Sequence, residues 1–153
     1  MSGKDVISNS NTTNTFLGVG AGSANTSGTI NSAYGGNALG SNTTGGGNTA
    51  NGYQALYSNT TGGNNTANGV GALHSNTIGY YNTAYGFSSL YTNTTGGYNT
   101  ANGSLALSAN TTGSFNTALG HCTGYSILTK QALAMCFWVT LQAITKRGQI
   151  SST

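Results

Sequence analysis

A unit of seventeen residues recurs without a slip through most of this chain, and this regularity limits the possible folds more than any other feature. The first residue of the unit, called position 1 below, is always an Asn: Asn14, Asn31, Asn48, Asn65, Asn82, Asn99 and Asn116. The consensus reads N-T-A-x-G-x-x-A-L-x-x-N-T-T-G-x-x. A fixed period of this length is the signature of a stacked repeat protein, in which each unit packs on the units before and after it.

The unit is too short for a pair of helices, and its apolar residues do not follow a helical spacing. Its N-T, T-G and N-G pairs supply about two corners per unit. The sequence therefore predicts an all-β protein, a β-solenoid or β-roll of about seven coils over residues 14–120. An N-terminal segment, 1–13, precedes the coils, and a divergent tail, 121–153, follows them.

The apolar positions 3, 8 and 9 of the unit are predicted to fill a thin interior, while variable positions such as Asn51, Tyr53, Gln54 and Tyr57 point outward. The predicted core residues of positions 3 and 9 are Ala50, Leu56, Ala67, Leu73, Ala84, Leu90, Ala101 and Leu107. Burying one Leu and two Ala stabilises a coil by only ~3 to 4 kcal/mol. Each coil must therefore depend on its neighbours for the rest of its stability.

Asn and Gly mark the corners of the predicted coil because both residues tolerate a positive φ. The amide of each Asn is also expected to bond to the same amide in the coils above and below, which gives two ladders. The ladder at position 1 consists of Asn31, Asn48, Asn65, Asn82 and Asn99, and the ladder at position 12 consists of Asn42, Asn59, Asn76, Asn93 and Asn110. The predicted corner glycines at position 5 are Gly52, Gly69, Gly86 and Gly103.

Charge is almost absent, since only 3% of the residues are charged and Asp5 is the one side-chain carboxylate. No Asp, Glu, Lys or Arg lies between Val6 and Thr129, so the net charge of +3 belongs to the two ends and does not predict nucleic-acid binding. The chain has 25 Gly and no Pro, as a flexible linker can have, but its nine Tyr and its apolar residues recur at fixed places. Order through repetition is the better interpretation.

The sequence carries no pattern typical of an enzyme, a cofactor site or a metal site. Paired-carboxylate catalysis needs a second acid, and a Ser nucleophile needs an orienting acid that the repeats lack. His74 and His121 stand at variable positions without a cluster of ligands, and Cys122 and Cys136 do not have a zinc spacing. The repeated N-T-T triplets match a glycosylation sequon but fall at the corners of the unit, and no signal peptide is seen.

The tail differs from the repeats, and residues 130–147 are predicted to form a short C-terminal helix. Residues 132–144 are apolar apart from Thr140 and Gln142, which is shorter than the ~20 apolar residues of a membrane-spanning helix. No membrane span is therefore expected. A second hypothesis is that the tail is an out-of-frame ending, because codons allowed for 131–153 can spell further repeats when read two bases later; the gene's nucleotide sequence decides this.

The motif at 48–62, 65–79, 82–96 and 99–113 resembles repeats found in bacterial and bacteriophage tail-fibre-like proteins, which in turn are thought to resemble the β-roll heads of trimeric autotransporter adhesins. The resemblance covers about residues 14–125. Such proteins often end in an intramolecular chaperone domain. The resemblance implies a fibrous, oligomeric component that is extracellular, on a cell surface or on a virion.

We expect a structural, fibre-forming protein whose partner is a further copy of itself, assembling by stacking and lateral association. One alternative is an adhesin that binds glycans with outward Tyr and Asn side chains. A second alternative is an ice-binding protein that uses the aligned column of Thr43, Thr60, Thr77, Thr94 and Thr111.

Overall fold

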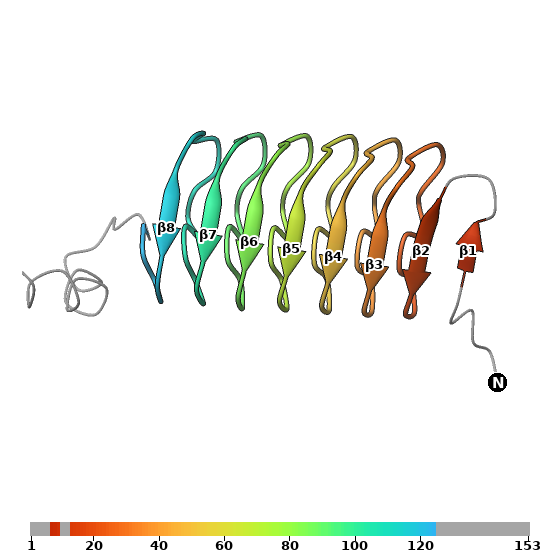
Figure 1. The fold of residues 1–153 in the computed structure, drawn as a ribbon, viewed down its shortest axis with the longest axis horizontal. Helices are drawn as coiled ribbons and strands as arrows, with labels where there is room; N and C mark the ends of the chain where they lie inside the picture. Colours follow the sequence, from red (N-terminus) through yellow and green to blue (C-terminus); the bar gives the residue numbers. More distant parts are fainter. Residues whose placement is uncertain (1–6, 10–12, 125–153) are drawn as a thin grey trace, which may run out of the picture.

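The computed structural model describes residues 7–9 and 13–124, which form a parallel β-solenoid of about six turns and contain no helix (Figure 1). The prediction of an all-β solenoid with a seventeen-residue repeat is confirmed. Its strands are β1 (Ile7–Asn9), β2 (Asn14–Leu17), β3 (Ser32–Tyr34), β4 (Thr49–Asn51), β5 (Thr66–Asn68), β6 (Thr83–Tyr85), β7 (Thr100–Asn102) and β8 (Thr117–Leu119). The helix predicted over 130–147 lies outside the described residues.

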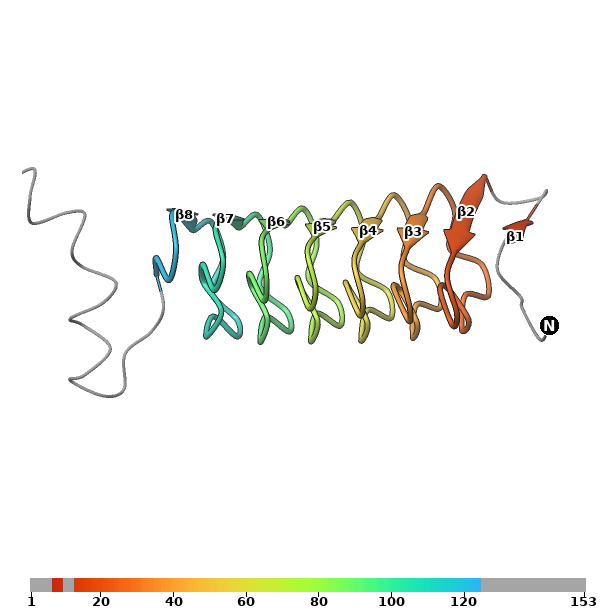
Figure 2. The same cartoon turned by 90° about the horizontal axis from the view of Figure 1, so that it is seen from below.

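Each coil contributes one short strand to a single sheet, and Figure 2 shows strands β2 to β8 aligned along one side of the stack. From β2 to β8, neighbouring strands pair in parallel with a shift of one whole unit, so that Ala50 of β4 lies opposite Ala67 of β5. Because successive side chains of a strand point to opposite faces, the Ala of T-A-N points inward while Thr and Asn point outward. The sheet thus presents equivalent residues in straight columns.

Backbone hydrogen bonds also join the coils outside the strands. The amide of Leu56 donates to the carbonyl of Ala72 at 3.0 Å, and the amide of Thr60 donates to the carbonyl of Thr77 at 2.9 Å. In the opposite direction, the amide of Gly52 donates to the carbonyl of Tyr34 at 2.8 Å. Every coil is therefore bonded to its neighbours at several points around its circumference, which compensates for the small amount of apolar surface that it buries.

The interior of a typical coil holds two Ala, one Leu and two Asn, and the fifth coil has a buried Ser89 in place of the second Ala. The predicted core residues Ala50, Leu56, Ala67, Leu73, Ala84, Leu90 and Ala101 have no exposed surface, and Leu107 in the sixth unit is buried. The first unit has Phe16 at position 3 in place of Ala and Gly22 at position 9 in place of Leu. A Cβ on Gly22 would lie 2.5 Å from the Phe16 ring, so this ring fills the space that Leu occupies in the other coils.

Positive φ values are not found at both of the residue types that were predicted to form the corners. Gly at position 5 has a positive φ, for example 142° at Gly69, but the ladder Asn residues do not, so that the predicted reason for Asn at the corners is wrong. The other positive-φ residues stand at positions 7, 9 and 17, and the buried Leu residues of position 9 are among them, with φ of 53° at Leu56 and Leu73. The left-handed region is costly for Leu, and the surrounding coils hold it there.

At the N-terminal end of the stack, β1 pairs with β2 in the antiparallel direction, with Ser8 opposite Thr15. This strand lies within the predicted N-terminal segment 1–13 and covers the edge of β2 that would otherwise be open. An open edge is a template for pairing with another chain. The first coil is therefore protected at its sheet edge by residues from outside the repeat.

Candidate functional site

The Asn side chains at position 12 form a continuous ladder inside the solenoid. The Nδ2 of Asn59 donates to Oδ1 of Asn42 at 2.7 Å, and the Oδ1 of Asn59 accepts a bond from Nδ2 of Asn76 at 2.8 Å. The second Nδ2 hydrogen bond of Asn59 goes to the carbonyl of Gly62 at 2.9 Å. The same pattern repeats at Asn42, Asn76 and Asn93, and Asn110 makes the same two donor bonds. These buried amides are satisfied by protein groups, as a dry interior requires.

The Asn side chains at position 1 bond chiefly to the backbone, but some also bond to one another as predicted: Nδ2 of Asn65 donates to Oδ1 of Asn48 at 3.2 Å and Nδ2 of Asn99 to Oδ1 of Asn82 at 3.1 Å. The Oδ1 of Asn48 accepts the backbone amide of Asn65 at 3.0 Å, and its Nδ2 donates across the coil to the carbonyl of Gly62 at 2.9 Å. Equivalent bonds hold Asn31, Asn65, Asn82 and Asn99. The carbonyl of Gly62 therefore accepts one bond from each ladder and joins the two, a connection that the repeat pattern does not reveal.

Glycine is required at positions 5 and 15 of the unit for two different physical reasons. Gly69, at the predicted corner of position 5, has a left-handed φ, and a Cβ there would lie 2.5 Å from the carbonyl oxygen of Gly86; the corner residues Gly52, Gly86 and Gly103 are similar. Gly62, at position 15, does not need a positive φ, but a Cβ there would overlap Oδ1 of Asn59. The period of the glycines alone does not distinguish these reasons.

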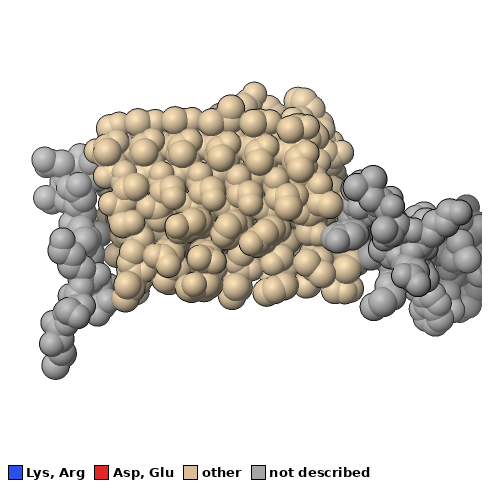
Figure 3. All heavy atoms as spheres, turned by 180° about the vertical axis from the view of Figure 1, so that it is seen from behind, with Lys and Arg blue, Asp and Glu red and all other residues tan. Residues whose placement is uncertain are grey.

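The described residues include no charged side chain, and the face of the coils seen in Figure 3 is uniformly tan. Apolar side chains are exposed at positions 4 and 6, on either side of the Gly corner that follows each strand. We call this column the apolar edge; it consists of Leu17, Val19, Tyr34, Tyr53, Val70, Tyr85, Phe87 and Leu119. Each of the first five coils supplies at least one member, whereas the sixth has Asn102 and Ser104 at these positions, so the apolar edge is unbroken over the first five coils.

A second column of exposed rings lies at position 17 and is called the aromatic ladder below. The rings of Tyr81 and Tyr98 are stacked with their centroids 5.1 Å apart, and those of Tyr98 and Phe115 are stacked at 5.0 Å. Tyr98 has a stacked ring on each face, whereas Phe115 at the end of the ladder is 77% exposed. The recurrence of aromatic residues at a spacing of seventeen is the sequence signal for this ladder.

A third aromatic column lies at position 10 and consists of Tyr57, His74 and Tyr91. The His74 ring stacks on Tyr57 with centroids 5.4 Å apart and on Tyr91 at 4.8 Å. Burial lowers the pKa of His74 below its ordinary value of 6.5, because the charged imidazolium loses solvation there. His74 thus serves as a neutral ring in a stack, and no cluster of metal-ligating side chains occurs within the described residues.

The Thr column considered for ice binding has its hydroxyl groups tied to the backbone. The Oγ1 of Thr43 donates to the carbonyl of Thr60 at 3.0 Å, and Thr60, Thr77 and Thr94 repeat this bond to the next coil. A hydroxyl that donates to the protein has no proton left for another acceptor. This bonding disfavours the column as a surface that orders water, and it gives Thr a structural role at position 13.

Within residues 7–9 and 13–124 the chain forms no helix with the length and apolar character that a membrane crossing requires. Comparisons with protein-family models, with curated proteins and with solved structures gave no match. What this chain does must therefore be inferred from its own surface.

Proposed function

We propose that this protein is a structural, fibre-forming subunit of an extracellular filament, a cell surface or a virion, and that its coils associate laterally along the apolar edge. The observation that carries the proposal is the column of exposed apolar side chains at positions 4 and 6 of five successive coils. Large exposed apolar patches on soluble proteins mark interaction surfaces. The occupant that fits best is a second copy, because its own straight column has the same coil spacing.

The absence of charge supports association between copies. No Asp, Glu, Lys or Arg occurs from residue 7 to residue 124, so the sides of two rods do not repel one another. Contacts of this kind hold no ion pairs, and we expect association to be nearly insensitive to salt. This expectation separates the apolar edge from an interface that depends on charge.

Growth by end-to-end stacking is restricted at the N-terminal end. The edge of β2 is paired with β1, so another copy can add there only after β1 leaves. Lateral association is therefore the main mode in this proposal. Stacking at the N-terminal end becomes possible when the residues before the first coil are removed.

Sedimentation velocity at micromolar concentration, in low and high salt, tests the lateral contact. The test variant removes the middle of the apolar edge by the substitutions Tyr53→Ser, Val70→Ser and Phe87→Ser. The matched control removes the aromatic ladder by the substitutions Tyr81→Ser, Tyr98→Ser and Phe115→Ser. We expect oligomers or filaments for the natural chain and for the control, and dispersal to monomers for the test variant. A monodisperse natural chain at all concentrations would end the fibre proposal.

The end of the stack is tested by deleting residues 1–12. We expect longer filaments in electron micrographs of this shortened chain, because the edge of β2 is then free to pair. Unchanged filament length would show that β1 does not limit growth. This second test concerns only the stacking mode and leaves the lateral contact to the sedimentation experiment.

A further inference from the structure

The aromatic column at position 10 stops abruptly. Tyr91 stacks on His74 at its N-terminal side, but the next coil has Ser108 at the same position. A ring at position 108 would continue the column, and Ser leaves most of that space empty. The consequence is a hollow on the side of Tyr91 that faces the following coil.

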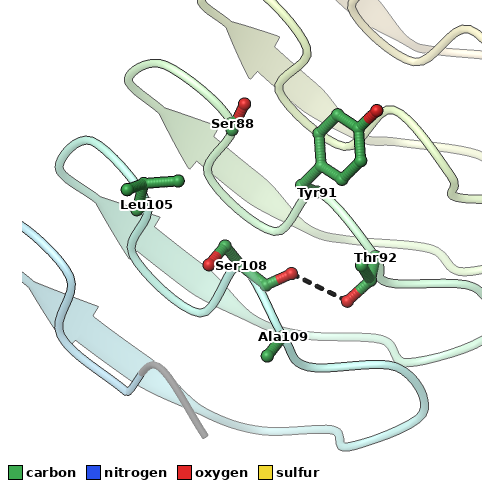
Figure 4. A pocket seen from close by; sticks show the side chains of 6 residues that line it. All are labelled: Ser88, Tyr91, Thr92, Leu105, Ser108 and Ala109. Carbon is green, nitrogen blue, oxygen red and sulfur yellow. Dashed lines mark hydrogen bonds between the residues drawn. The ribbon is translucent and has the colours of Figure 1, made fainter. Parts of the chain in front are cut away.

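This hollow is a pocket of about 250 Å³ between two coils (Figure 4). One coil contributes Ser88, Tyr91 and Thr92 to its wall, and the next contributes Leu105, Ser108 and Ala109. The Oγ1 of Thr92 donates to the carbonyl of Ser108 at 2.7 Å, which is the dashed bond in Figure 4 and ties the two walls together. The pocket is therefore built into the backbone of the stack and does not depend on a movable loop.

Ser108 supplies an unused polar group to this site. The residue is only 6% exposed, and its Oγ is the one buried side-chain oxygen or nitrogen without a hydrogen-bond partner in the part of the chain that the structure describes. Buried polar atoms in proteins nearly always have a partner, and an exception calls for a ligand or water. Ser108 lines the pocket, but its Oγ has almost no accessible surface, so a ligand reaches this hydroxyl only when the Ser108 side chain turns toward the pocket.

The chemistry of the wall selects a neutral ligand with hydroxyl groups. Two Ser and one Thr line the pocket with aliphatic hydroxyl groups, a Tyr adds an aromatic ring, and no lining residue is charged. A charged ligand would lose its hydration without gaining a counter-ion, whereas an unsubstituted aromatic ring would leave Ser108 unpaired. The volume lies below the range for drug-sized ligands and suits a single ring.

We propose that this pocket binds one hexopyranose unit of a neutral glycan. The C–H face of the sugar lies against the Tyr91 ring, whose electron-rich face attracts partly positive hydrogens. One sugar hydroxyl pairs with Oγ of Ser108 once that side chain has turned toward the pocket. Tyr98, in the middle of the aromatic ladder, does not offer this arrangement, because the rings of Tyr81 and Phe115 stack on its two faces. This site goes beyond the fibre proposal and would give a fibre one sugar site per copy.

Saturation-transfer NMR tests the site, because it observes the small ligand and works whether or not the full chain is assembled. The probes are the methyl glycosides of glucose, galactose, mannose and N-acetylglucosamine, titrated to millimolar concentration. We expect saturable transfer to at least one of them. Tyr91→Ala should weaken that binding about tenfold or more, while Tyr91→Phe keeps the ring face and should retain it.

Ser108 supplies a second pair of variants. Ser108→Ala should weaken binding about threefold to tenfold without lowering the unfolding temperature, because the hydroxyl makes no bond in the free protein. Ser108→Tyr should abolish binding by filling the pocket. Tyr53→Ala, on the apolar edge, should leave sugar binding unchanged.

Several results would overturn the sugar site. They are no saturable transfer to any of the four glycosides, equal binding by Tyr91→Ala, and equal binding by Ser108→Tyr. If p-cresol displaces the bound glycoside at a lower concentration than the glycoside itself needs to saturate the site, the pocket is assigned to an aromatic ligand instead. If Tyr91→Ala fails to fold, the comparison of Ser108→Ala with Ser108→Tyr still decides.

Discussion

Replacing Asn59 by Asp changes one NH₂ group into an oxygen in the middle of the position-12 ladder and leaves the shape almost the same. In the natural chain this NH₂ donates to Oδ1 of Asn42 at 2.7 Å and to the carbonyl of Gly62 at 2.9 Å. Asp puts an acceptor where both partners are also acceptors. The site has no exposed surface, so water cannot mediate the contact.

The cost of Asn59→Asp depends on the protonation of the new carboxyl group. When this group is protonated it keeps one O–H donor in place of the NH₂, so the variant loses one of two bonds and about 1 to 3 kcal/mol of unfolding free energy. Burial beside two acceptors raises the folded-state pKa of the new carboxyl well above the unfolded value of about 3.9. The folded state therefore holds the proton more tightly, and stability falls as the pH rises above the unfolded pKa, by about 1.4 kcal/mol per pH unit until the folded pKa is reached.

Urea unfolding followed by circular dichroism, at pH 3 and pH 7, measures this effect as a difference from the natural chain at the same pH. The extra loss at pH 7 should reach roughly 4 kcal/mol if the buried group is still protonated there. The matched control is Asn51→Asp on the outward face of β4, which should change stability by less than about 0.5 kcal/mol at both pH values. Equal losses for Asn59→Asp at the two pH values would refute a dry amide ladder.

Three further changes test the interior and the aromatic column. Leu73→Ala should lower the free energy of unfolding by about 2 to 4 kcal/mol, whereas Val70→Ala, at an exposed position, should change it very little. Equal effects of the two substitutions in thermal or urea unfolding would mean that Leu73 does not lie in the interior. Gly62→Ala should prevent the coil from closing, as seen in loss of the circular dichroism spectrum, while Thr61→Ala should be tolerated, and a normal fold for the Gly62 variant would remove the reason given for position 15. The fold lowers the pKa of His74, so protonation favours the unfolded chain and stability should fall as the pH drops below about 6.5. The variant His74→Phe should lose less stability over this pH range than the natural chain. Identical stability profiles of the two proteins against pH would contradict this prediction.

The strict period of Asn, Gly, Ala and Leu was enough to predict the solenoid and the inward position of Leu73, because a residue that recurs in every coil must have the same environment in each. Conformation was harder to predict than position. Leu73 adopts a left-handed φ that single-residue preferences disfavour, and only the bonds to neighbouring coils make it acceptable. The preferences of single residues therefore predicted a positive φ at the wrong positions of the unit.

Features that depend on differences between coils were also outside the reach of the repeat pattern. The pocket beside Tyr91 exists because one coil has Ser108 where its predecessors have rings, and a consensus averages such a change away. The exchange of Phe16 and Gly22 for Ala and Leu looks like decay of the motif, yet the two changes compensate in volume. The strand β1 has no repeat signal at all, since it pairs by its backbone.

The one-unit shift between paired strands has a consequence for how such a chain can change its length. Every coil bonds to the coils directly before and after it, and Thr49 meets Thr66 just as Thr66 meets Thr83. Duplicating or deleting seventeen residues therefore restores all of these contacts at the junction, whereas gaining or losing a single residue moves both Asn ladders out of line. Genetic variation in this protein should be tolerated in whole coils, so that the length of the solenoid can evolve without any change in its cross-section.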